Sequence, residues 1–384
     1  MLLATFYQAL EVRRREKIII ARFLEPHQVI STCRAAGGIR SDLEHIFNHQ
    51  VCEPEAHHPG ADDPGWNDPR EYRRRVCQRW DIPPDTCATL GTAANMNNAG
   101  IQVKRFRWLE VGAVVSAGVE GNAGRAGDPA VVFEEEGRFL DLGGERHPGP
   151  GTINIMLFIS HPLTPGALVR SVVTATEAKT AVLQELNINS RYSHGLATGT
   201  GTDQIAVACR REGGVPLTGA GKHCKLGELL ARAVMGALRQ TLTRQNRLTP
   251  AGQCSLRIHL ERFGGSKQRL LQGMCALLDP DTAARARHNF KALDRDPLTV
   301  AAAAALAHLQ DKLNWGVLPA TCRPEIMGAY AAQLAAAVSG KYHYLERYRR
   351  ELAPAPADHS DQALVELVCR ALALGYRDKW QEQG

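Results

Sequence analysis

The longest regular pattern of hydrophobic and polar positions lies between residues 151 and 209. The run GTINIMLFIS at 151–160 is almost wholly apolar and predicts a buried strand. In the segment 167–186, apolar residues recur at spacings near 3.6, which predicts a helix with one buried face. A second strand is expected within HGLATGTGTDQIAVAC at 194–209. This order predicts two neighbouring parallel strands joined by a crossover helix.

The helix at 167–186 carries one charged residue on its predicted apolar face and another beside it. The predicted face comprises Leu168, Val172, Ala175, Lys179, Val182, Leu183 and Leu186. Glu177 is expected to the side of this face. Because Glu177 and Lys179 are two positions apart on a helix, at most one of them can face a shared pocket.

Shorter patterns fill the rest of the first 248 residues. Residues 16–32 predict two short strands that end in a Gly-Gly turn, and GAVVSAG predicts a strand that runs into a glycine-rich loop. The stretch 53–70 is rich in Pro, Gly, Asp and His and predicts an exposed loop before a short charged helix. VVFEEEGRFLDLGG predicts a peripheral hairpin, and a last helix is expected from 225 to 245.

Beyond residue 250 the pattern changes to alanine-rich helical segments such as TVAAAAALAHLQDKL, broken by prolines. ELAPAPADHSD predicts a linker before a final helix. The expected fold is therefore an α/β domain with a mixed sheet and crossover helices at 1–248, followed by an all-helical C-terminal domain at 251–384.

Composition narrows the class of protein. Of the 384 residues, 44% are hydrophobic and 22% are charged, which is typical of a folded globular protein. The net charge of +6 is spread along the chain, so we expect no nucleic-acid partner. The ten cysteines form no CxxC pair and are expected to be reduced thiols. The first twenty residues lack the order of a secretory signal and no run is long enough for a membrane helix, so the predicted location is cytoplasmic. The sequence does not determine whether the chain forms homo-oligomers.

The loop ATGTGTD at 197–203 has two interpretations. It can be an ordinary glycine turn capped by Asp203. Alternatively, Gly199 and Gly201 let backbone amides approach a ligand closely, and the neighbouring threonine hydroxyls bind it. A nucleotide site is disfavoured because the loop lacks the lysine of a phosphate-binding loop and precedes a strand. The chain also contains no GxSxG or HExxH motif.

Four segments, taken together and in chain order, indicate a protein family. They are ISTCRAAGGI at 30–39, VSAGVEGNAGRAGDPA at 115–130, GTINIMLFISHPLTPGALVRSVVTATEAKTAVLQEL at 151–186 with ATGTGTD at 197–203, and GKHCKLGELLARAV at 221–234. Together they resemble the adenosylcobinamide amidohydrolases of corrinoid salvage, over roughly residues 25–245. The resemblance implies cleavage of the amide between the corrin ring's propionyl side chain and aminopropanol, giving adenosylcobyric acid. The loop at 53–70 and the helical tail depart from the short form of the family.

Amide hydrolysis needs a base or nucleophile, an acid for the leaving amine and donors for the oxyanion. The candidate catalytic residues are Glu177, Asp203 and His223. The simplest mechanism is attack by a water that Glu177 or Asp203 activates, with His223 protonating the amine. The candidate substrate-binding residues are Asn122, Asn154, Thr176, Lys179, Thr198, Gly199, Thr200, Gly201 and Thr202.

Each candidate also has a structural interpretation. Glu177 can be a solvated helix residue, His223 a surface residue, and the two asparagines can satisfy local backbone groups. A threonine nucleophile is less favoured because no base is adjacent in the sequence. A corrinoid-binding carrier or regulator without turnover is the alternative function, with a small-molecule corrinoid as the partner in either case.

A metal site is the remaining possibility considered. Five residues of the loop at 52–63 have side chains that bind metals: Cys52, His57, His58, Asp62 and Asp63. Their proline-rich setting favours a solvated loop instead. We therefore predict no metal ligands and no required cofactor beyond the cobalt that the substrate carries, although a divalent metal is not excluded.

Overall fold

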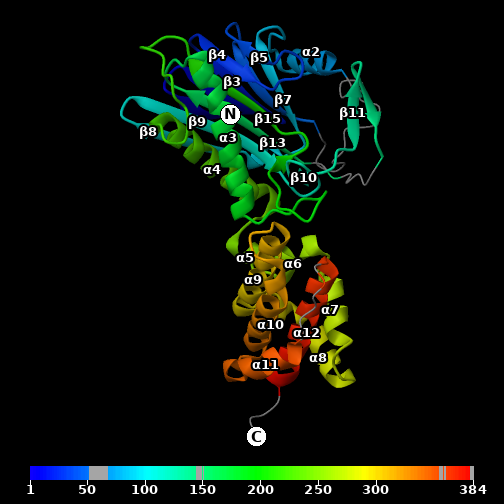
Figure 1. The fold of residues 1–384 in the computed structure, drawn as a ribbon. Coiled ribbons are helices and arrows are strands. Elements are labelled where there is room, and N and C mark those ends of the chain that lie inside the picture. The colour runs from blue at the N-terminus through cyan, green and yellow to red at the C-terminus, as the bar shows by residue number, and fades with distance from the viewer. Residues whose placement is uncertain (52–67, 144–148, 150, 354–357, 359, 381–384) are drawn as a thin grey trace. The chain divides into compact units, whose positions relative to one another are not determined.

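The computed structural model describes residues 1–51, 68–143, 149, 151–353, 358 and 360–380. The chain divides into two compact units, Met1–Leu248 and Thr249–Gly384. The first combines strands and helices, and the second is helical (Figure 1). The predicted fold class, an α/β region followed by a helical region, is confirmed.

Sheet A has five strands in the order β1-β2-β3-β6-β7. Their bounds are Leu2–Phe6 for β1, Leu10–Arg15 for β2, Ile18–Phe23 for β3, His45–Gln50 for β6 and Cys87–Thr92 for β7. All neighbours pair antiparallel except β6 and β7, which pair parallel. Helix α2 (Pro69–Trp80) packs on one face, against Ile18, Ile20 and Phe47.

Sheet B has six strands in the order β5-β4-β15-β13-β9-β8. Their bounds are Gly38–Arg40 for β5, His27–Ser31 for β4, Gln204–Arg210 for β15, Thr152–Ile159 for β13, Leu109–Gly118 for β9 and Gly100–Phe106 for β8. The predicted parallel pair is confirmed, because β13 pairs parallel with β15 and α3 (Pro165–Glu185) connects them. Helices α3 and α4 (Lys225–Asn246) cover one face of this sheet.

The two sheets pack against each other, so the layers run α2, sheet A, sheet B and then α3 with α4. The position of strand β13 between two hydrophobic cores explains why its sequence is almost wholly apolar. Ile155 and Leu157 point into the core under α3 and α4, while Met156 and Phe158 point into the core between the sheets. Every residue of β13 is buried because both faces of the strand are covered.

The sequence pattern predicted one sheet where the structure has two. Strands β3 and β4 were expected, but β1 and β2 were not. Strand β2 reads LEVRRR, in which Leu10 and Val12 are buried and the alternate positions are more exposed. Its three consecutive arginines hid this period of two, because only the first half of the strand alternates clearly.

Two short pairs of strands complete the first unit. Strand β10 (Ala123–Gly124) pairs with β14 (Gly199–Thr200), and β11 (Val132–Glu135) pairs with β12 (Arg138–Asp141). The second pair is the hairpin that the sequence predicted. A short 3-10 helix, η1, covers Met96–Asn98 before β8.

The second unit contains eight α-helices in its described residues. They are α5 (Pro250–Gln253), α6 (Leu256–Leu260), α7 (Lys267–Cys275), α8 (Pro280–Asp294), α9 (Pro297–Asn314), α10 (Arg323–Ser339), α11 (Leu345–Leu352) and α12 (Asp361–Lys379). Pro280 and Pro297 begin helices instead of breaking them, each after an aspartate whose side chain caps the first turn. Within the described residues, every helix is too short or too polar to span a bilayer.

Small residues and one ion pair organise the core of the helical unit. A Cβ atom on Gly375 of α12 would lie 2.4 Å from the carbonyl oxygen of Ala335 on α10, so glycine permits the close approach of these helices. Arg262 donates to both carboxylate oxygens of Asp311 on α9, at 2.6 and 2.5 Å. Both side chains are buried.

Candidate functional site

The candidate loop residues gather at one edge of sheet B. Strand β9 ends there, and β13 and β15 both begin there, because β13 runs antiparallel to β9 and parallel to β15. Three segments meet at this edge, which we call the loop edge: 119–128, 151–152 and 189–203. The end of β4 reaches it too, since the Thr32 hydroxyl accepts a hydrogen bond from Ile205 N at 3.0 Å. Segments far apart in the sequence therefore converge on one place.

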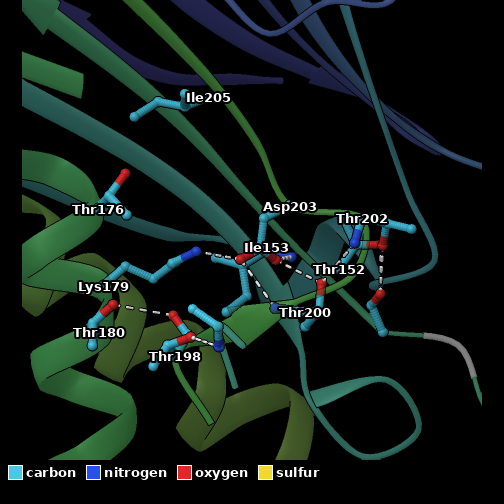
Figure 2. A network of polar contacts seen from close by, with 12 residues as sticks. Thr152, Ile153, Thr176, Lys179, Thr180, Thr198, Thr200, Thr202, Asp203 and Ile205 are labelled. Atoms are coloured by element: carbon cyan, nitrogen blue, oxygen red, sulfur yellow. Dashed lines mark hydrogen bonds and ion pairs between the residues drawn. The ribbon is translucent and has the colours of Figure 1, made fainter. Parts of the chain in front are cut away.

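Asp203 is the centre of this edge (Figure 2). Its Oδ1 accepts hydrogen bonds from Ile153 N at 3.0 Å and from the Thr200 hydroxyl at 2.6 Å. Its Oδ2 accepts one from Thr200 N at 3.1 Å and forms an ion pair with Lys179 on α3. A carboxylate offers about four acceptor sites, and here four donors occupy them. This geometry favours Asp203 as a positioning residue that holds the loop, and leaves it little capacity to take a proton from water.

The structure explains in a way that the sequence did not suggest why residue 199 is a glycine. Neither Gly199 nor Gly201 has a positive φ. A Cβ atom on Gly199 would lie 2.4 Å from Asp203 Oδ2 and 2.6 Å from Lys179 Nζ. Glycine is therefore needed at position 199 because a side chain would overlap the ion pair, and not because the backbone is strained. A Cβ atom on Gly201 would lie 3.4 Å from Asn122 Oδ1, which is nearly ordinary contact, and Gly201 is exposed.

The loop threonines make hydrogen bonds within the protein. The Thr198 hydroxyl accepts from Ala126 N at 2.8 Å, and the Thr198 carbonyl accepts from the Thr180 hydroxyl of α3 at 3.1 Å. The Thr202 hydroxyl lies 2.6 Å from that of Thr152 and donates to the Gly151 carbonyl at 2.8 Å. These bonds fix the loop to the segment that follows β10, to α3 and to the start of β13.

A second group of polar side chains supports the same edge. Asn122 donates to the Gly151 carbonyl at 3.0 Å and accepts from the Tyr192 hydroxyl at 2.9 Å. Nearby, Asp128 accepts from Arg125 N and from the Ser190 hydroxyl, both at 2.6 Å. Burial acts to raise the pKa of Asp128, but these hydrogen bonds and one from Ser193 lower the pKa below its usual value. The Asp128 carboxylate is therefore held ionised.

Asn154 lies away from this edge surface, in the space between the two sheets. It is fully buried, and its amide donates to Asn48 Oδ1 and to the Gly91 carbonyl, both at 2.9 Å. Asn48 donates in turn to the Ser116 hydroxyl at 2.7 Å. Both N–H groups of Asn154 are thus used to join the sheets. This arrangement favours a structural role over the predicted contact with substrate.

Glu177 lies on the exposed side of α3, and His223 lies in the turn before α4, next to the lysine that contacts Glu177. Glu177 is exposed and accepts from Lys222 Nζ at 3.2 Å. His223 is the next residue after Lys222 and is also exposed. Thr176 is exposed as well and donates to the carbonyl of Val172 in its own helix. Among the described contacts of Glu177 and His223, none reaches Asp203, so the three predicted catalytic residues fall into two groups.

Glu177 is nevertheless one helical turn from the loop edge. It precedes Thr180 by three positions, and residues three apart are neighbours on a helix surface. Thr180 binds the loop directly through the Thr198 carbonyl. The α3 surface around Glu177 and the loop edge are therefore adjacent parts of one region.

Sequence reasoning missed several residues of this region. Thr152, Tyr192 and Asn48 were not candidates, yet each binds a candidate residue. Ser116, which binds Asn48, was not a candidate either. A polar residue within an apolar strand was the signal that could have found Asn48 and Ser116, just as it singled out Asn154 in TINIMLFI. Tyr192 carried no such signal, because its loop is irregular.

The five residues considered for a metal site, and expected instead to form a solvated loop, belong to the segment 52–63. Cys52, His57, His58, Asp62 and Asp63 all lie outside the described residues. Among the residues that the structure describes, no group of three or more His, Cys, Asp and Glu side chains could hold a metal ion.

A family profile described as adenosylcobinamide amidohydrolase matches residues 3–250. The chain belongs to the adenosylcobinamide amidohydrolase family. The match confirms the resemblance seen in the sequence and covers the α/β unit, whereas the helical unit lies almost wholly outside it. An uncharacterised protein of Methanocaldococcus jannaschii is 32% identical over 240 residues, which are 60% of this chain and 88% of that protein.

One solved structure is also similar to this chain. It is the crystal structure of a Pyrococcus horikoshii protein, with a TM-score of 0.30 and 12% identity, covering 60% of this chain and 78% of that one.

Proposed function

We propose that the α/β unit of this adenosylcobinamide amidohydrolase family member hydrolyses the amide that links aminopropanol to the corrin ring of adenosylcobinamide. The products are adenosylcobyric acid, for cobalamin salvage, and 1-amino-2-propanol. The observation that carries the proposal is the family match over residues 3–250, combined with the convergence of several of its separate motifs on one edge of sheet B. The loop ATGTGTD and the segment 119–128 meet there.

The reaction adds one water across the amide. The water oxygen bonds to the amide carbon, the C–N bond breaks, and the amine leaves with a proton. We assign the role of base to Glu177, since Lys222 is its one described partner and it is open to solvent. His223, which follows Lys222, would protonate the amine.

The loop edge would bind the corrinoid. Gly201 and Thr202 are exposed at the tip of the loop, beneath which the Lys179–Asp203 ion pair fixes the backbone. Amide side chains at the rim of a corrin ring can exchange hydrogen bonds with such a polar, prearranged surface. In this assignment Asp203 positions the loop and does not take the proton. We also propose that the reaction needs no resident metal ion.

Incubation of purified protein with adenosylcobinamide, followed by mass spectrometry, tests the activity. We expect adenosylcobyric acid to appear at an undiminished rate after EDTA treatment. Tight binding with intact substrate would overturn the hydrolase and leave a corrinoid carrier. Activity that disappears on chelation and returns with a divalent metal would overturn the metal-free mechanism.

Glu177→Gln tests the base, because glutamine keeps the size of the side chain and removes its basic site. We expect turnover to fall about 10²- to 10⁴-fold while corrinoid binding persists. Glu228→Gln is the matched control: Glu228 is another solvent-accessible, though half-buried, helix carboxylate of the same unit, paired with Lys225 and Arg232. Normal turnover in a folded Glu177→Gln protein would move the base elsewhere.

A further inference from the structure

The β11–β12 hairpin exposes an unusual amount of apolar surface. Its strands are joined by a two-residue turn, Glu136 and Gly137, both with positive φ, as tight hairpin turns require. The large apolar side chains of the hairpin are between 42% and 61% exposed. They are Val132, Phe133, Phe139, Leu140 and Leu142. Apolar side chains that are exposed together on one short element form a candidate binding surface.

Packing within the hairpin does not hide these side chains. Phe133 is paired with Leu140 on one face, whereas Phe139 is paired with Glu134 on the other, so both faces carry an aromatic ring. A two-stranded hairpin is at best marginally stable alone in water. The hairpin therefore gains from any partner that covers Phe133 or Phe139.

Both ends of the hairpin are rooted at the loop edge. On the N-terminal side, Asp128 accepts hydrogen bonds from Arg125 N and from the Ser190 hydroxyl. On the C-terminal side, Gly149 crosses Gly121 so closely that a Cβ atom on Gly121 would lie 2.3 Å from the Gly149 backbone. Asp128, before the hairpin, and Gly149, after it, thus both lie at the loop edge. Figure 1 shows the hairpin standing clear of the two sheets.

We propose that the hairpin of residues 132–142 is a substrate-binding arm whose exposed aromatic side chains contact the corrin of the bound substrate. The inference rests on the proposed function, because the occupant to which it commits is adenosylcobinamide. A corrin ring offers a broad face edged with methyl groups, which aromatic side chains can cover. Phe133 and Phe139 are the residues that we assign to this contact.

Charge supports this occupant. The hairpin carries Glu134, Glu135, Glu136 and Asp141 against Arg138, a net charge of 1 − 4 = −3, in a chain whose net charge is +6. Adenosylcobinamide is a cation, because the corrin ring and the adenosyl carbon together neutralise only two of the three charges of Co(III), and its side chains are uncharged. An acidic arm attracts such a substrate.

The size of the hairpin also favours a small molecule over a second copy of the chain. Strands of four residues are roughly 13 Å long and each occupies a width of about 4.8 Å, so one face of the two-stranded hairpin covers on the order of 130 Å². A stable protein interface needs about 800 Å² from each partner.

The test is a spectral titration of the corrin chromophore with the full-length protein. Phe133→Ser and Phe139→Ser should each weaken adenosylcobinamide binding about ten- to a hundredfold, the amount expected for losing the burial of one phenylalanine. Val215→Ser is the matched control, because Val215 is also an exposed apolar residue, beyond the opposite end of β15. It should bind as the parent does. All three proteins should melt at the parent temperature, since the side chains are exposed.

Three outcomes separate this inference from the proposed hydrolysis. Binding that depends on the hairpin, without turnover, keeps the arm and overturns the hydrolase. Turnover with unchanged affinity in both hairpin variants keeps the hydrolase and overturns the arm. A parent that is dimeric, with monomeric hairpin variants that bind the corrinoid normally, assigns the apolar surface to self-association and also overturns the arm. Phe139→Trp gives a direct readout, because a corrin in contact should quench the added fluorescence.

Discussion

Each unit of the chain contains an ion pair that is buried or largely shielded from solvent, and the two pairs have different surroundings. In the helical unit, Arg262 and Asp311 form a bidentate pair with side chains 2% and 8% exposed. In the α/β unit, Lys179 and Asp203 are 11% and 17% exposed, and Asp203 also binds the backbone and hydroxyl of its own loop. The first pair joins helical segments in a core, whereas the second fixes a loop at an edge.

The difference indicates what each pair contributes. Removing one partner of a pair in a dry core leaves an unpaired charge and mainly costs stability. Removing Asp203 also releases a loop whose tip, at Gly201 and Thr202, is exposed. We therefore expect damage to the helical pair to unfold its unit, and damage to the loop pair to impair the proposed activity as well.

The largest effect on stability is expected for Asp311→Asn. It should destabilise the helical unit by about 3 to 5 kcal/mol, because Arg262 is left buried without its counter-ion. Chemical denaturation followed by far-UV circular dichroism measures this loss. Arg257→Met is the control: its pair with Glu261 is on the surface and should be worth less than about 1 kcal/mol. A cost for Asp311→Asn no larger than the control's would show that the pair is not isolated from water.

Asp203→Asn should reduce turnover of adenosylcobinamide about 10²-fold, because displacement of a positioning loop by about 1 Å has an effect of that size. Steady-state kinetics and a thermal melt of the same sample measure the two consequences. Lys179→Met should reproduce the loss, since it removes the other half of the pair. Parent activity in both variants would place the corrinoid site away from the loop edge.

Acid should weaken the α/β unit through His49. Burial first, and then Arg79 and Lys17, lower the pKa of His49 to about 4. An unfolded histidine, with a pKa near 6.5, takes up its proton at higher pH. The folded state therefore loses stability as the pH falls from about 6.5 to 4, by roughly 2 to 3 kcal/mol in total.

Denaturation of the parent and of His49→Gln across this pH range tests the prediction. The variant should show a flatter dependence, whereas His343→Gln, at an exposed position of the helical unit, should follow the parent. Equal slopes in the parent and in His49→Gln would contradict the assignment.

The smallest effects concern the two loop glycines. Gly199→Ala should cost about 1 to 3 kcal/mol, because its Cβ would overlap Asp203 Oδ2 and Lys179 Nζ. Gly201→Ala should change stability by less than about 0.5 kcal/mol, since the nearest atom is at 3.4 Å. Melting and corrinoid titration of both variants separate packing from binding. Weaker binding in a stable Gly201→Ala protein would indicate that the substrate lies on the exposed tip.

Much of the fold follows from local pattern. The apolar run at β13, the 3.6-residue period of α3 and the alanine-rich segments of the second unit each determine an element, because one or two faces must be buried. The Glu136–Gly137 hairpin is equally local. By contrast, β2 was missed because its arginines mask the alternation, and the pairing of strands into two sheets depends on contacts between distant segments.

Some features of the candidate site likewise follow from the sequence, and others depend on the tertiary structure. The sequence alone determined the residue types, the crossover unit and the family, because these depend on local order and on motifs that can be read along the chain. Only the tertiary structure decided that Lys179 neutralises Asp203, that Gly199 leaves room for this pair, and that Asn154 joins the sheets. A lysine within the apolar stripe of α3 was a sign that some partner existed. Its identity depended on β13 and β15 lying side by side, a long-range packing outcome that no local pattern encodes.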